Sequence, residues 1–125
     1  MHSDENRQKL LDGLREIAAR LRQFEQQAAV SLNDNDQAAY RLRQAEKTEM
    51  LIDLPRLAAG FLTGLDADSQ ETVTGGLNEF VQEAIMAKKV DSIFYMSVLL
   101  CPEKESEAGN NAFDNFIDSL ERGLG

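Results

Sequence analysis

The sequence is poor in the residues that build metal, haem and nucleophilic sites. Its 125 residues include one histidine, His2, one cysteine, Cys101, and no tryptophan. The paired Glu-x-x-His motifs of di-iron bundles and the Cys/His sets of zinc sites need more of these residues than that. Cys101 lies in an apolar run, where burial makes a thiol unreactive. The sequence therefore predicts no cofactor, no resident metal and no catalytic residue.

Long apolar runs are also missing. No stretch approaches the ~20 apolar residues that a membrane-spanning helix needs. The polar N-terminus, MHSDENRQK, lacks the apolar region of a secretory signal. A single cysteine leaves no internal disulfide and fits a reducing compartment. We therefore expect a cytoplasmic protein with no membrane partner.

Basic residues are scarce in the second half of the chain. Residues 1–63 carry ten acidic and nine basic residues, a net charge of −1, whereas residues 64–125 carry twelve acidic and four basic residues, a net charge of −8. Domains that bind nucleic acid normally present a basic face. We therefore expect no nucleic-acid partner, and a mimic of DNA charge is one reading of the acidic half.

Apolar residues recur at helical spacing along the chain and predict an all-α fold. The first stripe has steps of four and three residues and runs through Leu10, Leu14, Ile17, Leu21, Phe24 and Ala28. It predicts a helix over residues 3–32, roughly 45 Å long. The turn-forming residues 33–36 follow, and a second helix is expected over residues 36–64. A short turn between helices of matched length predicts an antiparallel hairpin.

Pro55 interrupts the second helix. Proline lacks a backbone N–H and clashes with the preceding turn, so a kink is expected near this residue. We favour a kinked helix that continues to residue 64. The alternative is a helix that restarts after Asp53, with Pro55 in its first turn.

Three shorter helices are expected after the hairpin. The first covers residues 67–89, with Asp68 and Glu71 as a capping pair, and contains Gly75-Gly76 as either a hinge or a site of close packing. The second covers residues 92–101, is capped by Asp91 and is apolar on all sides. Such a helix is normally buried, so we expect it in the middle of the core. Asn111 begins the last helix, over residues 111–123.

Residues 92–101 have one alternative to a helix, which bears on the fold of the whole chain. A strand is the alternative for this segment, but the sequence offers no second strand to pair with it. The chain as a whole, residues 1–125, therefore predicts a single helical bundle of about five helices. The bundle is built on the long N-terminal antiparallel helical hairpin.

The hairpin is too long for the remaining helices to cover, which predicts a protein-binding role. Exposed apolar surface is expected near Phe24, Leu32 and Tyr40, and surface of this kind usually meets a partner. Arginines of the same hairpin are candidate contacts to an acidic partner: Arg15, Arg22 and Arg43. We expect a non-catalytic protein–protein interaction module, adaptor-like or chaperone-like, that self-associates as a homodimer. Over residues 10–62 the hairpin is similar in general pattern to those of small acidic export chaperones.

Plentiful carboxylates give one enzymatic alternative. An all-helical, Mg²⁺-dependent hydrolase gathers acids from facing helices, and the candidates here are Glu46, Glu49, Asp53, Glu79 and Glu83. Such a site also needs basic groups for phosphates, and Lys47 and Lys88, the two candidates, are too few for that role. We therefore expect a protein that is not an enzyme.

Overall fold

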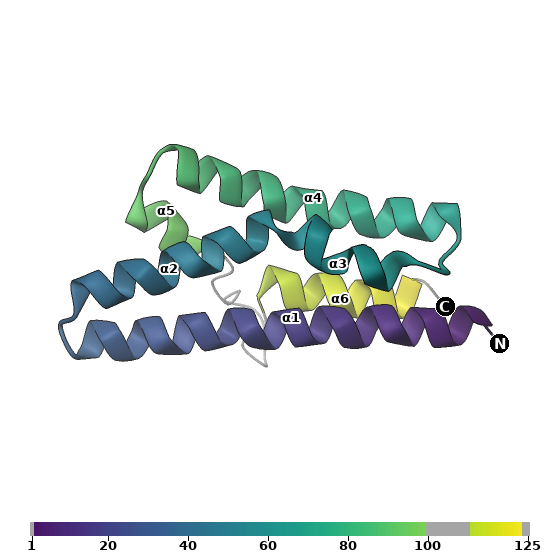
Figure 1. Ribbon diagram of the computed structural model, residues 1–125, viewed down its shortest axis with the longest axis horizontal. Coiled ribbons are helices and arrows are strands. Elements are labelled where there is room, and N and C mark those ends of the chain that lie inside the picture. Colours follow the sequence, from purple (N-terminus) through teal and green to yellow (C-terminus); the bar gives the residue numbers. More distant parts are fainter. Residues whose placement is uncertain (1, 100–110, 124–125) are drawn as a thin grey trace.

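A computed structural model describes residues 2–99 and 111–123, and every regular element in these ranges is a helix. The predicted all-α fold is confirmed (Figure 1). In chain order the helices are α1 (His2–Asn33), α2 (Gln37–Ile52), α3 (Leu54–Leu62), α4 (Ala67–Lys89), α5 (Ile93–Val98) and α6 (Ala112–Gly123). No helix in these ranges has the length and apolar character that crossing a bilayer would require.

The antiparallel hairpin of α1 and α2 makes the most extensive helix–helix contact of the described residues. Its turn uses Asn35 in the left-handed conformation, with φ of 59°, which asparagine tolerates better than most residues. Asp36 caps α2, because its carboxylate accepts a hydrogen bond from the backbone N–H of Ala39 at 3.1 Å. The turn residues thus place the apolar stripe of α1 against the buried face of α2.

The second predicted helix is two helices, so the kinked continuation to residue 64 is wrong. The chain breaks at Asp53, where α2 ends and α3 begins, and Pro55 lies in the first turn of α3. Proline cannot donate the hydrogen bond that a continuous helix needs at that position. The Asp53 carboxylate pairs with Arg56 at 2.8 Å and does not cap the helix. The described residues therefore contain six helices instead of about five.

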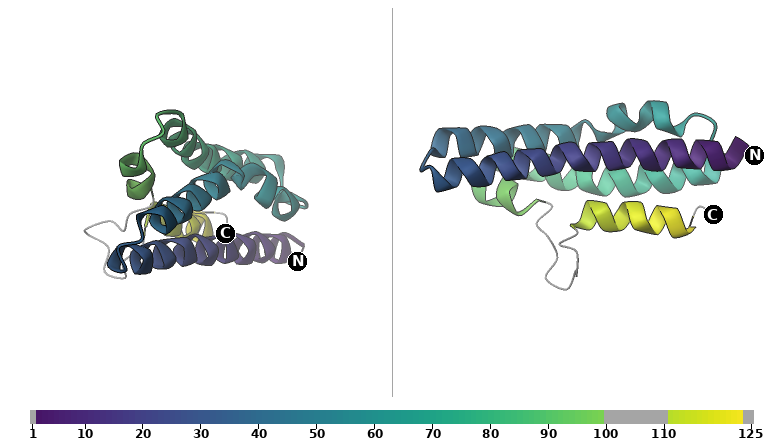
Figure 2. Two further views of the ribbon diagram at one scale, coloured as in Figure 1. Left: turned by 60° about the vertical axis from the view of Figure 1, so that its left-hand side comes forward. Right: turned by 90° about the horizontal axis from the view of Figure 1, so that it is seen from below.

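The helices form three layers. In Figure 1, α1 lies on one side, α2 and α3 form the middle, and α4 lies on the other side. Among the described residues no Cα atom of α1 lies within 8 Å of a Cα atom of α4. In one half of the bundle α6 contacts both of them, as Figure 2 shows from below, whereas in the other half α5 contacts α2 and α4 only.

The half that contains α6 holds an aromatic core. Phe80 of α4 lies 5.3 Å from Phe113 and 5.8 Å from Phe116, measured between ring centroids. Gly76 makes room for this cluster, since a Cβ atom there would overlap the ring of Phe116, whereas a Cβ at Gly75 would meet nothing within 4 Å. Close packing thus accounts for Gly76, and Gly75 faces open space.

The N-cap residue differs from the sequence prediction for α4 and α5 and agrees with it for α6. Asp66, not Asp68, caps α4, and its carboxylate accepts from the backbone N–H of Ser69 at 2.7 Å. Ser92, not Asp91, caps α5, because Asp91 adopts a left-handed φ of 50° in the turn before it. Asn111 caps α6 as predicted, in a reciprocal pair of hydrogen bonds with Asp114 of 2.9 and 3.0 Å. Local capping patterns therefore locate a helix start to within two residues.

The predicted burial of residues 92–101 is wrong. Met96 and Leu99 are buried, but Phe94 is 66% exposed and Tyr95 is 54% exposed. The reason is geometric: α5 has only six residues, and its neighbours α2 and α4 cover one side of it. Residues 100–101, including Cys101, lie outside the described residues.

Candidate protein-binding groove

Large exposed apolar side chains gather in one half of the bundle. Within residues 2–99 and 111–123 these are Val30, Leu32, Leu42, Ile85, Met86, Val90, Phe94 and Tyr95. They belong to the tip of the α1–α2 hairpin, the C-terminal end of α4, and α5, which lie in the same half in Figure 1. The half that contains α3 and α6 exposes none of them among the described residues.

An open, mainly apolar groove of about 640 Å³ runs between α4 and α5. Its lining residues are Gln82, Glu83, Met86, Ala87, Val90, Tyr95 and Leu99. The buried face of α4 repeats at helical spacing through Val81, Ala84 and Ala87, so Met86 and Val90 lie outside that face. The turn at Asp91 brings α5 back along α4, and Tyr95 and Leu99 form the second wall.

A buried lysine holds the end of α5 against the hairpin. The Lys47 side chain is fully buried, and its ammonium donates to the Leu99 carbonyl at 2.8 Å and to the Glu25 carboxylate. Gln44 and Thr48 are also buried beside it on α2, and the Thr48 hydroxyl donates to the Gln44 carbonyl at 2.8 Å. One ammonium thus joins α1, α2 and the end of α5, and it fixes one wall of the groove.

Sequence reasoning missed both the groove and the Lys47 network, although each left a signal. Gln44, Lys47 and Leu51 recur at spacings of three and four, which marks polar residues on a buried stripe. Met86 and Val90 are apolar residues four apart on the outer face of α4. Both signals become readable only once the buried faces of α2 and α4 are known.

The predicted aromatic and apolar contacts lie apart from the α4–α5 groove. Phe24 is half-buried and lines a second groove of about 390 Å³ between α1 and the α2–α3 junction. Leu32 is exposed at the hairpin tip, and Tyr40 is half-buried in the first turn of α2. Neither Leu32 nor Tyr40 lines the second groove with Phe24.

The predicted arginine contacts are engaged within the chain. Arg15 pairs with Glu121 of α6 at 2.5 Å, and Arg22 pairs with Asp114 of α6. Arg43 pairs with Glu46, three residues further along α2, at 2.6 Å. Two of the three arginines therefore help to hold α6 on α1.

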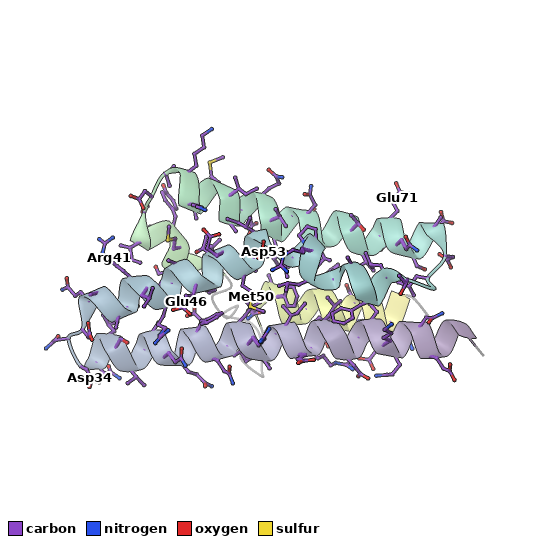
Figure 3. The ribbon with its side chains drawn as sticks, viewed as in Figure 1. Asp34, Arg41, Glu46, Met50, Asp53 and Glu71 are labelled. Atoms are coloured by element: carbon purple, nitrogen blue, oxygen red, sulfur yellow. The ribbon has the colours of Figure 1, made fainter. Side chains whose placement is uncertain are left out.

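The carboxylates of the enzymatic alternative do not converge. Glu46 and Asp53 lie two turns apart along α2–α3 (Figure 3), and Glu49 pairs with Lys88 of α4 at 2.5 Å. Glu79 and Glu83 lie on the exposed side of α4. Across residues 2–99 and 111–123, no three His, Cys, Asp or Glu side chains are close enough together to hold a metal ion.

Comparison with known proteins identifies no relative of this chain. No family model matches the chain, and no curated protein or solved structure is measurably similar to it. We therefore infer the function from the groove and the surfaces around it.

Proposed function

We propose that this protein is a non-catalytic interaction module that binds another protein through the α4–α5 groove. The observation that carries the proposal is the open apolar groove between α4 and α5, which is lined by the exposed apolar side chains of Met86, Val90 and Tyr95. Each Å² of apolar surface left in water costs about 25 cal/mol, and contiguous patches on soluble monomers are rare unless a partner covers them.

Self-association is one form of this proposal. A second copy would cover the same apolar surface and give a two-fold dimer. Light scattering distinguishes the forms, because a monomer has a mass of 13.9 kDa and a dimer twice that. A cytoplasmic location is also part of the proposal, and its support is the single cysteine.

Paired substitutions test the proposal. Met86 is 61% exposed in the groove and Val30 is 60% exposed outside it, while Tyr95 and Leu42 are both 54% exposed, in and outside the groove respectively. We expect Met86→Gln and Tyr95→Gln to reduce recovery of the partner from source cells by at least about tenfold, because central apolar contacts dominate binding energy. The matched controls Val30→Gln and Leu42→Gln are expected to recover it as the unaltered protein does.

Melting temperatures accompany these measurements. All four side chains are exposed, so we expect little change in stability and a loss of recovery that is not caused by unfolding. Equal recovery of the partner by the groove variants and their controls would contradict the proposal.

A further inference from the structure

Two acidic side chains of α4, Glu79 and Glu83, lie on the same face of the helix as the groove residues Met86 and Val90. Glu79, Glu83, Met86 and Val90 follow one another at steps of four, three and four residues and so share one face of the helix. Glu83 lines the groove, and Glu79 lies one turn before it. Both carboxylates are exposed, and neither has an ion-pair partner among the residues that the structure describes.

Among residues 2–99 and 111–123, the other charged groups near the groove do not neutralise the Glu79 and Glu83 carboxylates. Lys88 turns to the α2 side, where it pairs with Glu49 at 2.5 Å. Lys89 and Asp91 are both exposed at the end of α4 and balance each other in charge. α5 carries no charged residue. The groove is therefore apolar toward Val90 and acidic toward Glu79.

We infer that the groove binds an amphipathic helix of a partner protein that carries Lys or Arg beside its apolar face. The inference rests on the proposed function and names its partner class. From Gln82 to Val90 the lining of α4 spans about 12 Å, or roughly two turns, which matches a helix that lies in a groove. Apolar residues of that helix pack against Met86, Val90 and Tyr95.

The basic residues of the bound helix lie beside Glu83 and Glu79, one to two turns from its apolar contacts. These charge pairs fix the direction of the bound helix, since reversing it moves its cations toward Val90 and away from both carboxylates. Apolar contacts supply most of the affinity in this arrangement, and the carboxylates supply specificity for a basic partner.

Charge favours such a partner over a second copy of this chain. The net charge is −9, and residues 64–125 carry −8 of it. Two copies whose α4 helices met in the same direction would bring Glu79 and Glu83 of both close together, and like charges across an interface oppose binding. Arg15, Arg22 and Arg43 are already engaged by carboxylates of their own chain.

The test uses two synthetic helical peptides with the same apolar face, one carrying lysines and the other glutamates on its flanks. Fluorescence anisotropy measures their binding to the full chain. Glu79→Gln with Glu83→Gln is the test variant. Glu16→Gln with Glu71→Gln is the control, because it removes the same charge from exposed positions outside the groove.

We expect the lysine peptide to bind and the glutamate peptide not to bind. The test variant should weaken the lysine peptide by about tenfold, the effect of two partly exposed charge pairs. The control should change its affinity by less than about twofold, because screened charges at a distance contribute little. Failure of the lysine peptide to bind, equal binding of both peptides, or equal weakening by test and control variants would overturn the inference.

Three further outcomes separate this inference from the proposed function. A mass of twice 13.9 kDa that returns to the monomer value in Met86→Gln would assign the groove to a second copy and overturn the inference. A second outcome is that Met86→Gln no longer recovers the cellular partner, while Glu79→Gln with Glu83→Gln leaves binding of the lysine peptide unchanged. This result would support the proposed function and overturn the inference that the partner carries a basic helix. Recovery of the partner that is insensitive to Met86→Gln would instead remove the proposed function.

Discussion

The two halves of the bundle differ in the burial of their aromatic residues. In the half closed by α6, Phe113 is fully buried and lies 5.3 Å from Phe80. In the other half, Phe94 and Tyr95 of α5 lie 5.7 Å apart, and both are exposed. The more apolar of the two helices is thus the less buried one. The burial of a helix therefore depends on which sides its neighbouring helices cover, and its own composition does not decide it.

Truncating one phenylalanine in each half tests this comparison most strongly. We expect Phe113→Ala to lower the free energy of unfolding by about 3–5 kcal/mol, because it removes a large side chain from a packed core. Phe94→Ala should change it by less than about 0.5 kcal/mol, since its ring faces water. Urea denaturation measures both values. Similar losses in the two variants would mean that the two halves are equally packed.

The two adjacent glycines of α4 allow packing against α6 to be tested with the addition of one methyl group. Gly76→Ala should destabilise the protein by about 1–3 kcal/mol, because the new Cβ overlaps the ring of Phe116 in the closed half. Gly75→Ala should stabilise it by about 0.5–1 kcal/mol, because alanine favours the helix and its Cβ meets nothing within 4 Å. Thermal melting of the two variants measures the difference. A Gly76→Ala protein as stable as Gly75→Ala would show that Phe116 is loosely held.

The helix caps of the two halves give the smallest expected effect. Asp66 accepts from the Ser69 N–H at 2.7 Å in the closed half, whereas the Ser92 hydroxyl accepts from the Tyr95 N–H at 3.4 Å in the other. The hydrogen bonds from Ser69 to its carboxylate lower the pKa of Asp66 below its ordinary value of 3.8. The ionised cap therefore stabilises the fold above the ordinary pKa, and this contribution is lost as the pH falls through the lowered pKa.

A pH series of melting temperatures tests the cap. We expect the difference between the unaltered protein and Asp66→Asn to be constant near neutral pH and to shrink as the pH falls below 3.8. The matched variant Ser92→Ala, which has no titrating group at its cap, should differ from the unaltered protein by the same amount at every pH. A pH-independent difference for Asp66→Asn would assign no role to the ionised carboxylate.

The parts of the fold that the sequence predicts are those set by local periodicity. The stripe from Leu10 to Leu21 is buried as expected, because a 3.6-residue repeat lines up one face of any helix. The helix over 67–89 has the predicted range, and Asn111 caps the last helix. The turn at residues 33–36 likewise follows from residues that favour turns.

The parts that the sequence does not predict depend on contacts between distant segments. The exposure of Phe94 follows from the absence of α1 beside α5, and no local pattern encodes it. Arg15 and Arg22 look like a free basic patch until α6 brings Glu121 and Asp114 to them. The sequence does not predict the groove for the same reason. Met86 can be assigned to the exposed side of α4 only when the face of α4 that packs in the core is known.

The buried Lys47 has a consequence for the shape of the α4–α5 groove. Its ammonium has no contact with water, so losing either the Glu25 carboxylate or the Leu99 carbonyl would leave a poorly solvated charge. The end of α5 is therefore anchored to the hairpin. Moving the Leu99 wall of the groove away from α2 would break the hydrogen bond to this buried ammonium, so we expect the groove to resist widening on that side.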